Sequence, residues 1–93
     1  MATYYVNKTG NDSIGNGSIL LPWLTIQKAA NTLVAGDIAR VQPGLYDEIV
    51  SINNNGKLNQ PITFLGDGNN VQLRKFTINS HFIKCCFFSW ITI

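Results

Sequence analysis

The sequence has few charged residues, few prolines and no long apolar run. Charged residues make up 13% of the 93 positions, about half the share found in typical soluble domains. A single small domain of this kind must bury an unusual share of its surface, or bury it against something else. Because no apolar stretch approaches the roughly 18 residues of a membrane span, we expect no membrane partner. Residues 1–6 lack the features of a signal peptide, so an extracellular or virion-associated location would require another export route or assembly into a particle.

The chain also has little chemistry that points to nucleic acid, metals or cofactors. Its net charge is +2 and its longest basic run is Arg74-Lys75, so nucleic acid is not an expected partner. An acidic polysaccharide would tolerate this charge without being implied by it. Cys85 and Cys86 are adjacent and lack zinc-ligand spacing, so we expect buried thiols and no cofactor.

Asparagine, by contrast, is abundant. It tolerates left-handed backbone and bonds locally, so dense asparagine outside helices predicts many tight turns. A low-GC codon bias would explain the number equally well, but most of these residues fall between strand-like runs, which favours turns: Asn7, Asn11, Asn16, Asn31, Asn53, Asn54, Asn55, Asn59, Asn69, Asn70 and Asn79.

One helix and several short strands are predicted. After a strand at 3–6 and a polar loop at 7–18, Trp23 leads into a helix that Thr25 caps and Gly36 closes, with one apolar stripe of Ile26, Ala29, Ala30 and Leu33. After this helix the helical spacing of apolar residues ends, and short β-rich runs follow at 38–42, 48–52, 62–65, 71–73, 76–78 and 82–93.

The second half aligns with itself at a lag of 21 residues, which brings Val41, Ile62 and Ile83 into register. A spacing in the low twenties suits one coil of a parallel β-solenoid, although so few periods leave chance alignment as a competitor. The open end of the first coil needs a cap, which the preceding amphipathic helix can supply. We therefore expect a single mainly β module over 1–93, with strand, loop and capping helix at 1–36 and about two and a half coils at 37–93.

The order of motifs resembles the opening of pectate-lyase-like right-handed parallel β-helix proteins. These include chondroitinase-B-like and alginate-lyase-like polysaccharide lyases and phage tailspike-like proteins. The resemblance covers about residues 3–78 and rests on Tyr4-Tyr5-Val6, Gly10-Asn11-Asp12, Pro22-Trp23, residues 25–29, 36–41 and 43–48, Asn54-Asn55-Gly56 and residues 60–64.

Several motif residues have structural roles in this interpretation. Asp37 bonds backbone at the corner between helix and strand, Pro43-Gly44 makes a tight turn, and Tyr46 packs its ring on the cap with its hydroxyl in water. The predicted structural set is Trp23, Ile26, Ala29, Ala30, Leu33, Gly36, Asp37, Pro43, Gly44 and Tyr46.

No residue is assigned a catalytic role. Asp47 and Glu48 are the only adjacent carboxylates, and neighbours on a strand face opposite sides, so they cannot easily flank one bond. Asp12 and Asp67 lack a calcium-loop pattern, and the resemblance places calcium ligands and the general base on coils further along a longer parent protein. For His81, a surface or turn role is favoured over that of a base.

Three cations form the candidate substrate site. Lys57, Arg74 and Lys75 could line a groove for acidic sugars, or could form an ordinary solvated face. Trp23, Trp90 and Tyr46 could stack on sugar rings, but packing is favoured.

Two functions from different classes are compatible with these features. The first is a carbohydrate-directed β-helix module, the cap of a lyase-like or tailspike-like protein without a complete active site. The second is a self-assembling structural subunit of a virion appendage or an extracellular filament. In either case the apolar C-terminal end is expected to meet further coils or another copy.

Overall fold

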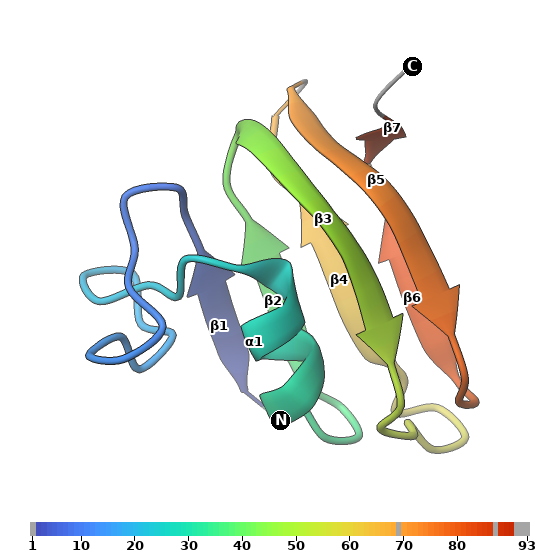
Figure 1. The fold of residues 1–93 in the computed structure, drawn as a ribbon. Coiled ribbons are helices and arrows are strands. Elements are labelled where there is room, and N and C mark those ends of the chain that lie inside the picture. Colours follow the sequence, from blue (N-terminus) through green and yellow to red (C-terminus); the bar gives the residue numbers. More distant parts are fainter. Residues whose placement is uncertain (1, 69, 87, 91–93) are drawn as a thin grey trace.

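The computed structural model describes residues 2–68, 70–86 and 88–90 (Figure 1). The chain is mainly β with one helix, as predicted. Its strands form two parallel sheets, sheet A in the order β1-β2-β4-β6 and sheet B in the order β3-β5-β7. The elements are β1 (Thr3–Val6), α1 (Ile26–Thr32), β2 (Ile38–Val41), β3 (Gly44–Ile52), β4 (Ile62–Gly66), β5 (Val71–Ile78), β6 (Ile83–Cys86) and β7 (Ser89–Trp90).

From β2 onward the strands alternate between the two sheets, but their spacing along the chain is not constant. Ile62 lies opposite Ile83, which is the predicted lag of 21. Ile38, however, lies opposite Thr63, a separation of 63 − 38 = 25 residues, and Val41 faces Gly66 rather than Ile62. The constant lag is therefore wrong between β2 and β4, because the loop at 53–61, which follows β3, is longer than the turn at 79–82, which follows β5.

Strand boundaries also differ from the sequence prediction. The runs 71–73 and 76–78 form one strand, β5, and β3 begins at Gly44 rather than at residue 48. A β-bulge between Tyr46 and Ile49 gives β3 one more residue than its partner. Of the run predicted at 82–93, the structure describes β6 and β7, and residues 91–93 lie outside the described part.

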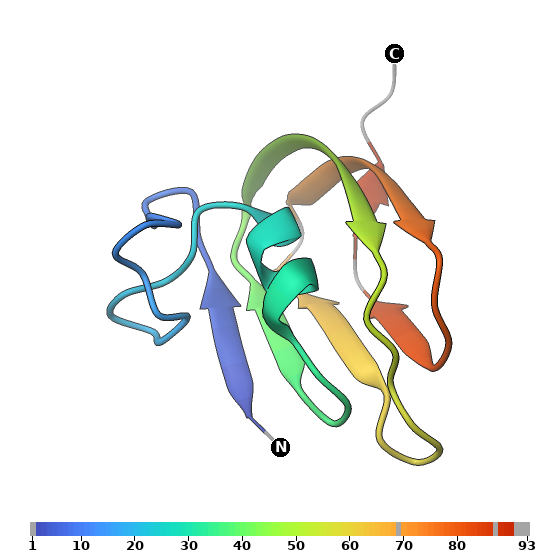
Figure 2. The ribbon, with the colours of Figure 1, turned by 60° about the horizontal axis from the view of Figure 1, so that its bottom comes forward.

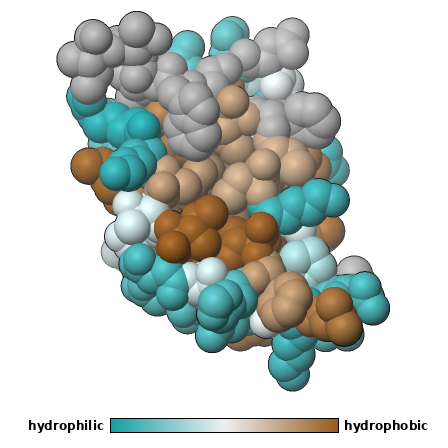
Figure 3. Space-filling model, turned by 90° about the vertical axis from the view of Figure 1, so that its right-hand side faces the viewer, coloured by the Kyte–Doolittle hydropathy of each residue, from teal (hydrophilic) through white to brown (hydrophobic). Residues whose placement is uncertain are grey.

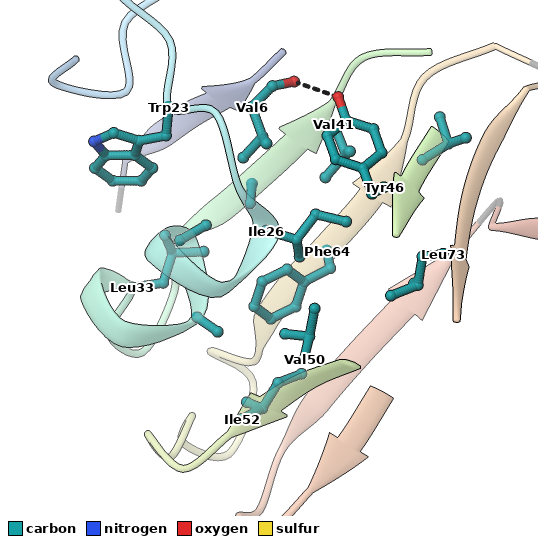
Figure 4. Packing of buried hydrophobic residues seen from close by; sticks show 14 of the residues in the cluster. Val6, Trp23, Ile26, Leu33, Val41, Tyr46, Val50, Ile52, Phe64 and Leu73 are labelled. Carbon is teal, nitrogen blue, oxygen red and sulfur yellow. Dashed lines mark hydrogen bonds between the residues drawn. The ribbon is translucent and has the colours of Figure 1, made fainter. Parts of the chain in front are cut away.

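The core lies between the two sheets and under the helix (Figure 4). Tyr46 is fully buried, and its hydroxyl donates to the Gln42 carbonyl at 2.8 Å. The prediction that this hydroxyl lies in water is therefore wrong, since a buried O–H must find a partner inside the protein. The buried apolar residues are Val6, Trp23, Ile26, Ala29, Ala30, Leu33, Ala39, Val41, Tyr46, Val50, Ile52, Ile62, Phe64, Val71 and Leu73.

The helix is shorter than predicted. Thr25 caps its N-terminus by accepting from the Lys28 backbone N–H at 3.2 Å, but it ends at Thr32 rather than at Gly36. Gly36 lies in the following turn with φ +87°, a backbone angle that suits glycine. Beside it, the buried Asp37 accepts from the backbone N–H of Ala2 and of Val34, each at 3.0 Å, and so fixes the corner between helix and β2.

The first edge strand of each sheet, β1 in sheet A and β3 in sheet B, has hydrogen-bond partners along its outer side, so we call these N-terminal edges closed. In sheet A, residues 17–23 bond along the outer edge of β1: the Tyr5 N–H donates to the Gly17 carbonyl at 2.7 Å, and the Trp23 N–H donates to the Tyr5 carbonyl at 3.0 Å. Figure 2 shows this loop folded against the outer side of β1. In sheet B, the Gln27 side-chain amide accepts from Ser51 N–H at 2.8 Å and donates to its carbonyl at 3.0 Å. A helix side chain thus replaces the missing neighbouring strand.

In the described part of the chain, no strand covers the opposite end of the two sheets. Ala39, Phe64 and Cys85 stack as successive members of one inward-facing row, and the first two are fully buried whereas Cys85 is exposed. The prediction of buried thiols is therefore wrong for Cys85, because the described chain places no further strand over it. Seen from the side of β5 and β6, this end is apolar across its middle, with hydrophilic residues beside and below that middle (Figure 3). Among the described residues no helix has the length and apolar character to cross a membrane.

Candidate functional site

Two of the three predicted cations lie on the outer face of sheet B. Arg74 and Lys75 are consecutive exposed residues of β5, and Lys75 lies opposite the exposed Ile49 of β3. The Arg74 guanidinium forms an ion pair with Asp47 on β3, so its charge is largely neutralised locally. Lys75 makes no ion pair with any described residue, which leaves it as the accessible cation of this face.

Lys57 lies elsewhere. It is exposed in the loop between β3 and β4, where it and Gln60 exchange backbone hydrogen bonds of 2.9 and 2.8 Å. In the described part of the chain, no hydrogen bond or ion pair joins it to Arg74 or Lys75. The structure thus brings two members of the predicted trio together and places the third on a separate loop.

All five side-chain carboxylates form hydrogen bonds or ion pairs with other residues of the chain. Asp47 and Glu48 point to different sides of β3, as expected for neighbours on a strand. Asp47 is exposed beside Arg74, and Glu48 reaches the start of α1. The other three each accept at least two hydrogen bonds, from Thr25 and Leu24 to Asp12, from Ala2 and Val34 to Asp37, and from Arg40 and Gln42 to Asp67. Two carboxylates that flank an open space, as hydrolysis of a glycosidic bond requires, are therefore not found among them.

Asp12 fastens the polar loop to the helix start. Its Oδ2 accepts from the Thr25 hydroxyl at 2.6 Å, and its Oδ1 accepts from the Leu24 backbone N–H at 2.8 Å. Burial alone would raise the pKa of this carboxyl, but the hydrogen bonds from Thr25 and Leu24, with the nearby Lys28 charge, outweigh it and lower the pKa. A role in holding the loop fits this geometry better than a calcium site does.

Asp67 is held on the outer side of sheet A. Its Oδ1 accepts from Arg40 at 3.0 Å and its Oδ2 accepts from Gln42 at 2.7 Å. Each oxygen thus already has a hydrogen-bond donor within the protein. Within the described ranges, no three His, Cys, Asp or Glu side chains come close enough to hold a metal ion.

The asparagine run at the end of β3 has a role that sequence reasoning missed. Asn53 accepts from the side chain of Asn79, in the turn after β5, at 3.0 Å. Asn54 donates to carbonyls at the C-terminal end of α1, including that of Leu33 at 3.0 Å. Asn55 accepts from the His81 backbone N–H at 2.8 Å. These three consecutive residues thus bond to the turn at 79–82 and to the end of α1. The sequence signal for this role was a run of three asparagines directly after a strand-like segment.

The remaining candidates serve packing or backbone contacts. The His81 backbone bonds to Asn55 and Gly56, with its side chain exposed. The buried Trp23 ring stacks on Tyr4 at 5.1 Å between centroids, so it is not available to a sugar. The Lys8 ammonium lies 4.9 Å from the Tyr46 ring centroid, above a ring that is itself buried. The Trp90 side chain lies outside the described part.

The comparisons with known proteins identify structural neighbours related to carbohydrates. No family model matches the chain, and no curated protein sequence matches it. A structure described as XylC in complex with xylose is 37% identical, with a TM-score of 0.69, over 74% of this chain and 11% of that one. A rhamnogalacturonan lyase is 20% identical, with a TM-score of 0.80, over 100% of this chain and 30% of that one. The chain thus spans less than a third of either neighbour, and both likenesses are consistent with a pectate-lyase-like fold.

Proposed function

We propose that this chain is the capped N-terminal end of a right-handed parallel β-helix in a carbohydrate-directed protein. The alternation of parallel strands between sheets A and B, closed at one end and uncovered at the other, carries this proposal. Parallel crossovers within a sheet are right-handed in almost all proteins, which supplies the expected hand. The likeness to the xylose-bound XylC structure supports the carbohydrate class.

The outer face of sheet B is the proposed contact surface for an acidic polysaccharide. Lys75 would approach the uronate carboxylates directly. Arg74 lies beside it on the same face, but its charge is already paired with Asp47, so its contribution would be smaller. Because the lysine is exposed, each contact is weak and screened by salt. Binding would therefore depend on repeated units of the polymer, and its affinity should fall as salt rises.

Affinity electrophoresis or calorimetry with polygalacturonate and with xylan tests this surface. We expect retardation by the uronate polymer, reversed by salt and weakened by Lys75→Ala. Lys84→Ala is the matched control, because it removes the same charge from an exposed strand residue of sheet A. Equal weakening by both variants would mean that net charge, rather than the face of sheet B, drives binding, and binding of xylan alone would refute the acidic substrate class.

The chain is proposed to lack a complete active site, because each of its carboxylates is engaged and its histidine lies in a turn. Incubation with uronate polymers should give no unsaturated product by ultraviolet absorbance. Product formed by the purified chain, and lost when a described side chain is changed, would refute this part of the proposal.

The uncovered end favours a second candidate, a self-assembling structural subunit. Ile78 is 50% exposed although it follows the fully buried Ile52 in the same row, so a further layer would bury apolar surface. Since the N-terminal edges are closed, strand pairing would join two copies at their uncovered ends, and a filament would need an additional contact. Size-exclusion chromatography separates the candidates, because a monomer at all accessible concentrations would contradict self-assembly.

A further inference from the structure

The sequence contains two Asn-Gly pairs, Asn16-Gly17 and Asn55-Gly56. In such a pair the glycine has no side chain to keep its backbone nitrogen away from the asparagine amide. We propose that Asn55-Gly56 is the principal site of spontaneous deamidation in this protein, and that backbone contacts with His81 in the last coil control the rate. This inference does not depend on the proposed function.

The reaction needs no partner other than water. The Gly56 backbone nitrogen attacks Cγ of Asn55 and loses its proton, while the side-chain nitrogen leaves as ammonia, which closes a succinimide ring. Water then adds to either ring carbonyl and opens it to aspartate or isoaspartate. The net change converts an amide and water into a carboxyl group and ammonia, without an oxidant or a cofactor.

Both reacting groups are held by the same residue in the folded chain. Asn55 Oδ1 accepts from the His81 backbone N–H at 2.8 Å, and the Gly56 N–H donates to the His81 carbonyl at 2.9 Å. Asn55 is exposed and Gly56 is buried, with the turn at 79–82 so close that a Cβ on Gly56 would lie 2.3 Å from the Phe82 carbonyl oxygen. The Gly56 N–H must therefore leave the His81 carbonyl before its nitrogen can attack, while the bond to Oδ1 restrains the Asn55 side chain.

The residues that restrain Asn55 lie next to the described strands with the fewest pairing partners, β6 and β7. In the described part of the chain, β6 pairs with β4 alone, and β7 pairs with β5 at two positions. Phe82, which leads into β6, has φ +59°, a strained angle for a bulky residue. Segments with few neighbours open locally far more often than the core does, so the last coil should expose Asn55 without global unfolding.

Asn16-Gly17 is an internal control with matched exposure. Asn16 is likewise exposed and Gly17 buried. Here the restraint lies in the closed N-terminal end: Asn16 Oδ1 accepts from Ser18 N–H at 3.0 Å, the Gly17 N–H donates to Leu21 at 3.0 Å, and the Gly17 carbonyl is bonded to β1. Opening this site disrupts the edge of sheet A, so it should react more slowly than Asn55 in the folded protein.

Peptide mapping by mass spectrometry after incubation at mildly alkaline pH tests the proposal. In urea, where only local sequence acts, the two sites should convert at similar rates. In the folded chain both should slow, with Asn55 several-fold faster than Asn16, because the reacting population follows the open fraction. Asn16 converting as fast as Asn55, or Asn55 remaining intact in the folded chain, would overturn the proposal.

Two variants sharpen the test. Asn55→Gln should abolish conversion at position 55 and leave that at Asn16 unchanged. His81→Ala keeps the backbone groups that restrain the site, so the Asn55 rate should not fall. A several-fold decrease in this variant would show that the imidazole promotes the reaction, and would overturn control by the backbone contacts.

Discussion

The Glu48 carboxylate lies against the first turn of α1, where it accepts from the backbone N–H of Ile26 at 3.0 Å. Its other oxygen accepts from the Gln27 N–H at 3.1 Å. These N–H groups have no partner within the helix, and the negative charge suits the positive end of the helix dipole. With Asn54 at the other end of α1, β3 and the loop after it fix both ends of a helix too short to be stable alone.

Glu48→Ala should lower the free energy of unfolding by about 1–3 kcal/mol, because it leaves the backbone N–H groups of the buried Ile26 and of Gln27 without this acceptor. Chemical denaturation followed by circular dichroism measures this change. Asp47→Asn, which removes a neighbouring carboxylate from an exposed ion pair, is the control and should cost no more than about 1 kcal/mol. Equal losses from both variants would contradict the capping role of Glu48.

Asp12 should make the stability of the chain depend on acid pH. Its folded pKa lies below the ordinary value of 3.8, so its contribution is fully present above that value and is lost as pH falls through the folded pKa. Denaturation at a series of acid pH values should show this loss in the natural chain, and Asp12→Asn should lack that component. An identical acid dependence in both would rule out Asp12 as its source.

Tyr46 should stay protonated at a pH that ionises a free tyrosine. Burial, and then the nearby Glu48 charge, raises the pKa of this phenol well above its ordinary value of 10.0. Alkaline absorbance titration should therefore show a step that Tyr46→Phe removes, at a pH well above that value. The variant should also cost about 0.5–1.5 kcal/mol, since it removes the bond to Gln42. A lost step near the ordinary value would contradict the burial of this hydroxyl.

Ile52 and Ile78 provide a matched pair across the uncovered end. They are paired on neighbouring strands, and Ile52 is fully buried whereas Ile78 is 50% exposed. Ile52→Ala should cost about 2–5 kcal/mol, and Ile78→Ala should cost markedly less because its side chain is only half buried. Equal losses in equilibrium unfolding would mean that another copy already covers this end in solution.

Much of the architecture could be predicted because it depends on local patterns. The apolar stripe that includes Ile26 and Ala29 predicted the helix, and the short β-rich runs predicted a mainly β chain. The constant lag failed because the loop at 53–61 and the bulge in β3 add residues without changing which strands pair. Register between parallel strands is set by packing and hydrogen bonding across the sheet, which no single-sequence period records.

The candidate site was less predictable than the fold. The sequence could mark Lys57, Arg74 and Lys75 as cations near strands, but not that Asp47 pairs with Arg74 or that Lys57 lies on a separate loop. These outcomes depend on distances between residues far apart along the chain. Neighbouring charges such as Arg74 and Lys75 can therefore differ in their partners.

Local patterns in the sequence predicted the helix, most strands and the turns between them, because side-chain period, capping residues and glycine act over a few neighbouring positions. The partner of each polar group became known from the folded structure: Glu48 bonds to the start of α1, Tyr46 to the Gln42 carbonyl, and Asn55 to the backbone of His81. A hydrogen bond requires two groups to lie within about 3 Å of each other, and that proximity exists only after the sheets have paired.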